Sequence, residues 1–241
     1  MREHIIQKRG LDLATHEQIY RNEVDAYEFM ISKQPGLTKY INEIQPIHGL
    51  DILDLGAGSG RFAASLAKQA KSLICTDISE SMLNLLDSKL EKQGTHRNWK
   101  TLIADHRKLP IEDQSIDIVI SGWSICYLTH TGNERWEENL EQIFKEMKRV
   151  LRNRGTIIIF ETMGTGTEIP KPPEYLKPYF HALTDKYDFK HRWVRADYEF
   201  PSFEEAKNGT EFFFGKEVAQ RIVHNEWSIV PECAGIWWKH Y

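Results

Sequence analysis

Hydrophobic and polar positions follow two regular patterns along the middle of this chain. Short apolar runs predict strands at residues 51–55, 73–77, 100–104, 116–121 and 156–161. Apolar residues recur at helical spacing over residues 59–70, 80–92 and 133–151. This alternation of strands and helices predicts an α/β fold, in which a parallel sheet carries helices on both faces.

Both ends of the chain extend this pattern. Apolar positions between Ile19 and Ile31 predict a helix that Pro35-Gly36 ends, and a short helix over 37–44 follows. From Met163 to Tyr179, glycines and prolines interrupt any regular element. Beyond that segment, the pattern predicts a strand at 192–200, a helix at 217–224 and a closing strand at 229–238.

Composition narrows the class of protein. The chain has 241 residues and a net charge of −4, with no lysine- or arginine-rich tract that would favour nucleic acid. Its cysteines, Cys75, Cys126 and Cys233, lack metal-ligand or disulfide spacing, so we expect free thiols and no metal. No apolar run approaches a membrane span, and the first residues do not resemble a signal peptide. We therefore expect a cytoplasmic protein.

The segment after the first predicted strand carries the most specific chemistry. Asp54 is followed by three alternating glycines, Gly56, Gly58 and Gly60, and a helical pattern begins directly after them. Glycines allow a ligand to approach the backbone, and a helix N-terminus offers free N–H groups. Two cofactors fit this turn. Gly58, Gly60 and Ala63 satisfy a dinucleotide fingerprint, whereas the acid-x-Gly-x-Gly-x-Gly spacing satisfies another pattern.

That second pattern resembles motif I of the class I S-adenosylmethionine-dependent methyltransferases, and the resemblance continues over roughly residues 40–162. Asp77-Ile78-Ser79-Glu80-Ser81-Met82-Leu83 is similar to the second motif, and Asp105 follows the third strand as in the family. Residues 113–121 are similar to the entry into the fourth strand, and 149–155 to the turn before the fifth. That last turn departs from the family by having Asn153 and Arg154 where proline and glycine are usual.

The resemblance implies a three-layer Rossmann-like sandwich with a mostly parallel seven-stranded sheet and an antiparallel last strand. It implies S-adenosyl-L-methionine as cofactor, with Asp54 near its ammonium, Asp77 on the ribose hydroxyls and Asp105 near the adenine amino group. The full predicted cofactor set is Asp54, Gly56, Ala57, Gly58, Asp77, Ile78, Met82, Asp105, His106 and Ser121. Structural alternatives remain open, since Asp77 can cap a helix and Asp54 can bond loop N–H groups.

The acceptor side is less determined. Residues 121–128 follow the fourth strand, where open α/β sheets bind ligands, and lack the signature of DNA amino-group methylases. Tyr127 and His130 are candidates for orienting or deprotonating an acceptor, and Tyr27 for covering it, although each can instead be a packing residue. For the aromatic residues toward the C-terminus, from Phe212 to Trp238, we favour packing over an acceptor pocket.

These observations predict a single methyltransferase domain over 1–241, with a helical lid at 13–45, a cofactor-binding core at 46–162 and an acceptor-side segment with a closing hairpin at 163–241. We expect an enzyme of the quinone- and natural-product-type branch that methylates nitrogen, oxygen or carbon of a small molecule or short peptide. Methylation of RNA or a protein side chain is the runner-up. An NAD-dependent dehydrogenase and a non-catalytic cofactor-binding module are alternatives from other classes.

Overall fold

The chain forms two compact units in a computed structural model that describes residues 16, 18–20, 22–94 and 97–241. The larger unit comprises Gly36–Glu161, Tyr175–Arg192 and Ile236–Tyr241. The smaller unit comprises the described residues up to Pro35 together with Thr162–Glu174 and Trp193–Gly235.

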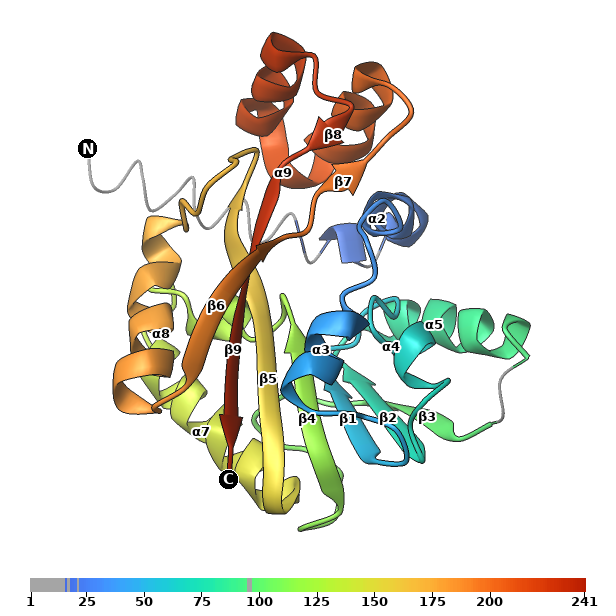
Figure 1. Cartoon of the computed structure of the whole chain (residues 1–241), viewed down its shortest axis with the longest axis vertical. Coiled ribbons are helices and arrows are strands. Elements are labelled where there is room, and N and C mark those ends of the chain that lie inside the picture. The colour runs from blue at the N-terminus through green and yellow to red at the C-terminus, as the bar shows by residue number, and fades with distance from the viewer. Residues whose placement is uncertain (1–15, 17, 21, 95–96) are drawn as a thin grey trace. The chain divides into compact units, whose positions relative to one another are not determined.

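Helices and strands follow one another in the order that Figure 1 labels. The first half of the described chain contains α2 (Val24–Ile31), α3 (Thr38–Ile44), β1 (Asp51–Leu55), α4 (Ala63–Leu66), β2 (Ser72–Asp77), α5 (Glu80–Lys92), β3 (Trp99–Ile103) and β4 (Ile116–Gly122). The second half contains α6 (Cys126–Thr129), α7 (Trp136–Val150), β5 (Leu151–Thr165), η1 (Glu174–Leu176), α8 (Lys177–His181), η2 (Ala182–Lys186), β6 (Lys190–Arg195), β7 (Tyr198–Glu199), α9 (Phe203–Asn225), β8 (Ile229–Val230) and β9 (Glu232–His240).

The main sheet has seven strands in the order β3-β2-β1-β4-β5-β9-β6. Strands β3, β2, β1, β4 and β5 pair in parallel, and the last strand, β9, is antiparallel. The order reverses beside β1, where β2 and β4 flank the strand that leads into the glycine turn. Ligands bind at such a switch point, beyond the carboxyl ends of the strands.

Burial explains why β1 and β4 occupy the centre of the sheet. Every residue of β1 is buried, as expected for a strand covered on both faces. Helix α7 contributes the apolar face that its spacing predicts, while Glu137 and Glu138 lie exposed in its first turn. In Figure 1, α3 lies in front of the sheet and α7 behind it, so helices cover both faces. The predicted α/β sandwich is confirmed.

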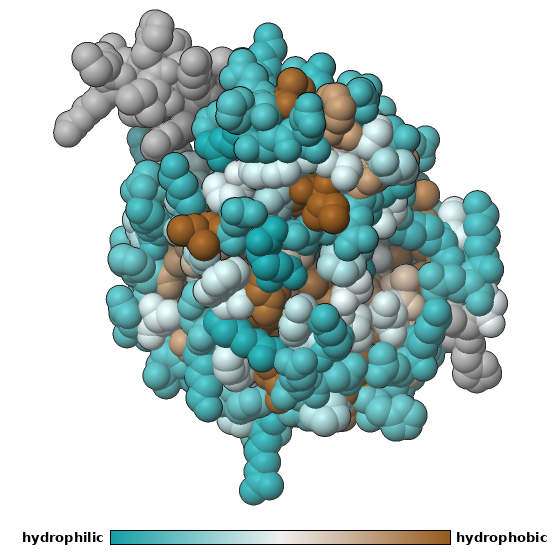
Figure 2. Space-filling view, turned by 45° about the horizontal axis from the view of Figure 1, so that its top comes forward, coloured by the Kyte–Doolittle hydropathy of each residue, from teal (hydrophilic) through white to brown (hydrophobic). Residues whose placement is uncertain are grey.

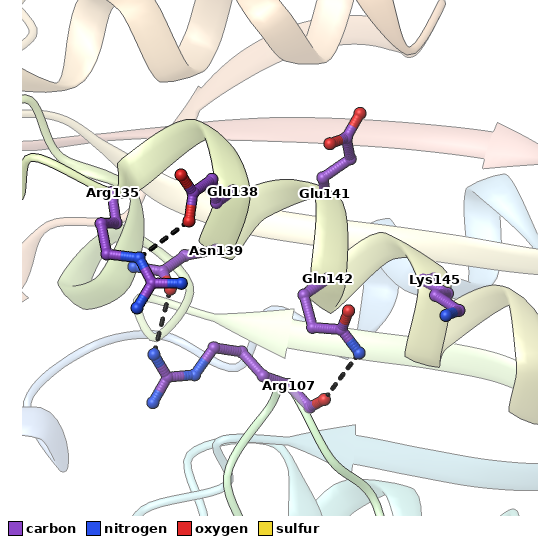
Figure 3. Close-up of a pocket in the computed structure, with 7 residues that line it drawn as sticks. All are labelled: Arg107, Arg135, Glu138, Asn139, Glu141, Gln142 and Lys145. Carbon is purple, nitrogen blue, oxygen red and sulfur yellow. Dashed lines mark hydrogen bonds and ion pairs between the residues drawn. The ribbon is translucent and has the colours of Figure 1, made fainter.

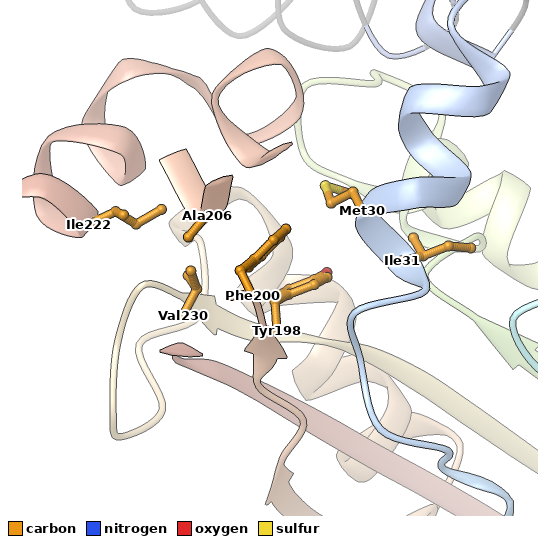
Figure 4. Close-up of a cluster of buried hydrophobic side chains, with 7 residues drawn as sticks. All are labelled: Met30, Ile31, Tyr198, Phe200, Ala206, Ile222 and Val230. Carbon is orange, nitrogen blue, oxygen red and sulfur yellow. The ribbon is translucent and has the colours of Figure 1, made fainter. Parts of the chain in front are cut away.

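The smaller unit has its own hydrophobic core. The buried side chains drawn in Figure 4 are Met30, Ile31, Tyr198, Phe200, Ala206, Ile222 and Val230. Phe212, Phe213, Phe214 and Trp227 pack against this cluster. In the larger unit, Trp237 stacks on Phe180 and His191, with ring centroids 4.7 and 4.3 Å apart. The packing interpretation of these aromatic residues is therefore confirmed.

The predicted helix over 59–70 is reduced to the four residues of α4, Ala63–Leu66, and further boundaries differ from the sequence expectation beyond residue 150. Strand β5 continues to Thr165, past the predicted end at residue 161. The expected absence of regular elements up to Tyr179 is wrong, because α8 begins at Lys177. Pro178 lies in the first turn of this helix, where backbone N–H groups have no partner within the helix, so a proline there removes no helical hydrogen bond. Helix α9 extends from Phe203 to Asn225 through a kink at Gly215, and only its second half shows a clear helical pattern in the sequence.

Among the described residues, no helix is both long and apolar enough to cross a membrane. Apolar atoms on the face shown in Figure 2 form separate spots among polar ones. Residues 1–12, and residues 13–15, 17 and 21 of the predicted lid, lie outside the described part of the chain.

Candidate functional site

The glycine turn after β1 is fixed to the neighbouring strand. The N–H groups of Gly56 and Ala57 both donate to the Thr76 carbonyl of β2, at 2.8 Å each. Gly56, Gly58 and Gly60 all have positive φ, at 74°, 54° and 94°, which only glycine adopts without strain. A side chain at Gly60 would meet Leu86 of α5, whereas the space beside Gly58 is open. The turn therefore leaves its backbone accessible at its middle glycine.

Asp54 lies directly before this turn with an unsatisfied carboxyl group. Its side chain is 1% exposed, and neither carboxyl oxygen has a hydrogen-bond partner within the described structure. Burial, and then the nearby charge of Asp77, raise the pKa of Asp54 to about 7. A buried acid without a donor costs stability, so this arrangement indicates a missing positively charged or hydrogen-bonding ligand.

Asp77 ends β2 on the other side of the turn. One carboxylate oxygen accepts from the Gly58 N–H and the other from the Ser79 N–H, both at 2.9 Å. Ser79 itself caps α5 by accepting from the Met82 N–H. The helix cap thus belongs to Ser79, as the sequence allowed, and Asp77 is available at the edge of the turn.

Apolar side chains flank Asp77. Ile78 follows it with 70% exposure, and Ile103, paired with Asp77 in the sheet register, is 55% exposed. Met82, in α5, is buried. Two exposed isoleucines beside a carboxylate provide an apolar surface on which a planar base could pack.

Asp105 and Ser121 are each engaged with other groups of the protein. Asp105 forms a two-pronged ion pair with Arg107, which keeps the pKa of Asp105 below its usual value. The Ser121 hydroxyl is buried and donates to the Leu55 carbonyl at 2.9 Å, which links β4 to β1. Their assignment to the cofactor stays a prediction.

His106, which follows Asp105, is buried. Its Nε2 lies 2.7 Å from the Ser124 hydroxyl, and the Gly56 backbone lies directly beside both side chains. Burial lowers the pKa of His106, so the imidazole is neutral near pH 7. Ser124 is a site residue that the sequence reasoning did not select.

The loop between β4 and α6 is held in a strained shape. Trp123 has φ of 52°, a left-handed conformation that is unfavourable for a bulky residue. Its N–H donates to the Phe160 carbonyl at 2.8 Å, and the Arg61 guanidinium lies 4.3 Å from its ring. These contacts hold the loop at the carboxyl end of β4.

Glu161 is a second buried acid at the same edge of the sheet. It accepts from the Cys126 N–H at 3.1 Å and from the Tyr179 hydroxyl at 3.3 Å. Burial raises the pKa of Glu161 to about 7. Sequence reasoning missed this residue, although a glutamate directly after the apolar run 157–160 was a signal.

The three candidate acceptor residues belong to two different compact units. Tyr127 and His130 lie in and after α6 of the larger unit, whereas Tyr27 belongs to the smaller unit. The His130 ring is buried and its Nδ1 accepts from the Gly132 N–H at 3.0 Å. Tyr27 packs edge-on against Tyr20 with centroids 5.1 Å apart. Both contacts fit packing roles, and the acceptor assignments stay predictions.

A polar pocket of about 500 Å³ lies beside α7 (Figure 3). Its walls are Arg107, Arg135, Glu138, Asn139, Glu141, Gln142 and Lys145. Arg135 pairs with Glu138, and Arg107 donates to Asn139. Its charges largely compensate one another, so this pocket resembles a solvated helix surface. No metal-binding cluster occurs among the described residues.

Comparison with known proteins follows the same part of the chain. Residues 53–159 match the family described as "Methyltransferase domain". Phosphoethanolamine N-methyltransferase of Triticum aestivum is 31% identical over 144 residues, which cover 57% of this chain and 26% of that protein. Demethylmenaquinone methyltransferase of Lactobacillus johnsonii is 32% identical over 127 residues, covering 52% and 48%. The chain thus spans between about a quarter and a half of these relatives.

A solved structure extends the likeness to the fold. Phosphoethanolamine N-methyltransferase 1 of Haemonchus contortus, in complex with phosphoethanolamine and S-adenosylhomocysteine, aligns with a TM-score of 0.52 and 15% identity. The alignment covers 94% of this chain and 49% of that one. The strand order, the glycine turn and the matched domain define a Rossmann-like methyltransferase fold. Residues 53–159 of the chain are thus similar to a methyltransferase domain, and the fold is of the same Rossmann-like kind.

Proposed function

We propose that this chain transfers a methyl group from S-adenosyl-L-methionine to a small-molecule acceptor. The observation that carries the proposal is the orphaned carboxyl group of Asp54 beside the open backbone at Gly58. A buried acid without a partner fits the ammonium group of the cofactor's amino-acid part, and an open glycine lets that part approach the backbone.

The remaining predicted contacts fit the other parts of the same ligand. Asp77 stands at the end of β2, where its carboxylate can accept from the ribose hydroxyls, and Ile78 and Ile103 offer apolar surface for adenine. When bound, this cofactor supplies an electrophilic methyl group on a sulfonium. The protein's tasks are then to orient the acceptor and exclude water.

The acceptor is proposed from the relatives and from charge. Relatives named for phosphoethanolamine and demethylmenaquinone support a small-molecule acceptor, and the net charge of −4 disfavours RNA. Residues 121–128 after β4, with Tyr127 and His130, are the proposed acceptor-side segment, and Tyr27 is proposed to cover it. We place the enzyme in the cytoplasm.

Calorimetry tests the cofactor. Wild-type protein is titrated with S-adenosylmethionine, S-adenosylhomocysteine, NAD and NADP. We expect binding of the first two only. Binding of a dinucleotide without any response to S-adenosylmethionine would overturn the proposal.

A labelled-methyl assay tests the acceptor. The protein is incubated with methyl-labelled cofactor and, separately, phosphoethanolamine, demethylmenaquinone, a small-metabolite extract, total RNA and a protein extract. We expect label in a small molecule. Label only in RNA or protein would support the runner-up, and cofactor binding with no transfer to any pool would indicate a binding module.

A further inference from the structure

The His106 imidazole lies against the glycine turn of the cofactor site. A Cβ built on Gly56 would come within 1.9 Å of the Ser124 hydroxyl and 3.1 Å of His106 Cε1. The edge of the ring that carries Cε1 therefore points at the first glycine of the turn. Real Cβ atoms do not approach other atoms so closely, so a residue with a side chain at position 56 would clash with Ser124 and His106.

Only one ring nitrogen of His106 is engaged. Nε2 bonds the Ser124 hydroxyl, while Nδ1 has no partner within the described residues, although the side chain is only 9% exposed. An unpartnered nitrogen at this depth costs free energy unless a ligand or water satisfies it. Ser124 directly follows Trp123, which has a positive φ and donates its N–H to the Phe160 carbonyl of β5, so Ser124 belongs to a loop that is bonded to the sheet.

The covalent structure of the cofactor limits what His106 can face. Its sulfur joins the ribose, which we place at Asp77, to the amino-acid part, which we place at Asp54 and Gly58. The His106 ring lies against Gly56, which is two residues after Asp54 and two before Gly58, and the Gly58 N–H donates to Asp77. The ring is therefore next to the part of the turn that joins these two positions. We propose that His106, held by Ser124, faces the sulfonium end of the cofactor and admits the charged donor only while its imidazole is neutral.

The inference rests on the proposed function, and it goes further by assigning a selectivity. S-adenosylmethionine carries a positive sulfonium, and its product S-adenosylhomocysteine carries an uncharged thioether at the same place. An imidazolium beside a sulfonium is a like-charge contact in a poorly solvated site, which is strongly unfavourable. Protonation of His106 therefore weakens binding of the donor much more than binding of the product.

Three charged groups act on His106 from its surroundings. Burial lowers the pKa of His106, the charges of Asp77 on β2 and Asp105 beside it raise that pKa, and Arg107 lowers it. Asp54 on β1 faces Asp77 and itself titrates near pH 7. Because burial has the largest effect, the pKa of His106 lies below 6.5, and the selectivity change falls on the acid side of neutrality.

Calorimetry of both ligands from pH 8 to pH 5 tests the inference. For wild-type protein we expect the ratio of donor to product affinity to fall at least about fivefold with decreasing pH, as a like-charge contact predicts. The side chain in His106→Gln cannot become charged, so the affinity ratio of this variant should stay constant with pH. Because the variant keeps Asp54, it separates the effect of His106 from any effect of Asp54. His191→Gln is the matched control, because burial also lowers the pKa of His191. The His191 ring stacks on Trp237, and its strand, β6, is the edge strand of the sheet, beyond β5 and β9. It should behave as wild type.

A second measurement uses the unaltered protein and does not depend on a variant folding. The imidazole resonances of His106 are titrated by NMR in each complex. We expect the donor to lower the His106 pKa further than the product does, because binding and protonation are linked. An equal effect of both ligands, or the same change of affinity ratio in His106→Gln as in wild type, overturns the inference. If neither ligand binds wild-type protein, the proposed function itself fails.

Discussion

Two carboxyl groups on neighbouring strands meet the same glycine turn in different hydrogen-bonding states. Asp77 accepts from two backbone N–H groups of the turn and the following helix, whereas both oxygens of Asp54 lack partners among the described residues. Different measurements therefore test the roles of the two residues. Loss of Asp77 is expected to affect mainly the ligand, and loss of Asp54 to change how stability depends on pH.

Asp77→Ala should weaken cofactor binding by roughly 1.5–3 kcal/mol, or about ten- to a hundredfold, because it removes a charged hydrogen-bond acceptor. The free protein should also become less stable, since the Gly58 and Ser79 N–H groups lose their acceptor. Calorimetry with S-adenosylhomocysteine and thermal unfolding measure the two effects. Ser79→Ala is the control, because it removes the cap of α5 but leaves the carboxylate. Unchanged affinity in Asp77→Ala would show that Asp77 only supports the turn.

Asp54→Asn should make the free protein more stable at pH 8. The folded pKa of Asp54 is about 7, above the ordinary value of 3.8 for an aspartate, so the folded state holds this proton more tightly than the unfolded state. Stability from this group therefore falls as pH rises from about 4 to about 7 and then stays level. The variant avoids that loss, by up to about 4 kcal/mol. Urea unfolding at pH 5 and pH 8 measures it.

Asp51→Asn on the same strand is the control of opposite sign. Burial alone would raise the pKa of Asp51, but hydrogen bonds from Ser72, Lys71 and Arg152 lower it overall. Asp51 thus contributes stability above its unfolded pKa, and the variant should be less stable at both pH values. If the two variants show the same pH dependence, burial of Asp54 is not what controls its protonation.

At the scale of elements, the turn between β1 and α4 shows how glycines serve different needs. Gly60 allows close packing on Leu86, Gly56 makes room for Ser124, and Gly58 faces open space. Only at Gly58 is the space that a side chain would occupy open to a ligand. The three positions share positive φ, so backbone strain alone does not distinguish them.

Gly58→Ala should weaken S-adenosylhomocysteine binding at least about tenfold, because its Cβ would enter the space of the ligand. Its stability cost should be only about 1 kcal/mol, the cost of a positive φ for alanine. Gly49→Ala is the matched control, since Gly49 also has positive φ with no atom near a built Cβ, but lies before β1. Calorimetry and unfolding of both variants decide the point. Equal loss of affinity in both would remove Gly58 from the site.

At the scale of the molecule, the two compact units divide the predicted residues. Every proposed cofactor residue belongs to the larger unit, while Tyr27 and the helix α2 that carries it belong to the smaller one. Helix α2 also supplies Met30 and Ile31 to the core of the smaller unit (Figure 4). A purely covering role for this helix would not require such burial.

Deletion of residues 1–33 should therefore destabilise the smaller unit and leave the larger one folded. Loss of Met30 and Ile31 exposes apolar surface on Tyr198 and Phe200, and each buried aliphatic side chain contributes about 2–5 kcal/mol. Hydrogen exchange should show lost protection over residues 198–230 but not over β1 to β4. S-adenosylhomocysteine should still bind, because its proposed contacts remain.

Tyr27→Phe provides the comparison for the deletion, because it keeps the ring packing and removes only the hydroxyl. It should preserve protection in both units. Loss of protection across β1 to β4 after the deletion would show that the two units fold as one.

The sequence by itself determined the alternating strands and helices, the glycine turn, the acids at the strand ends and the resemblance to methyltransferases. These features are readable because they depend on local spacing: an apolar run predicts a buried strand, and a turn that needs positive φ requires glycine. Strand 51–55 and helix 80–92 were predicted to the residue. Where local spacing is weak, as in the first half of α9, the prediction failed.

Only the tertiary structure decided which polar groups meet. Ser124 with His106, Glu161 with Tyr179, and Arg107 with Asn139 are contacts between segments 18 to 32 residues apart, with no periodic signal in the chain. The same holds for the burial of Asp54 and the membership of α2 in a core. Burial and pairing depend on which strands become neighbours, and the order in space differs from the order in sequence.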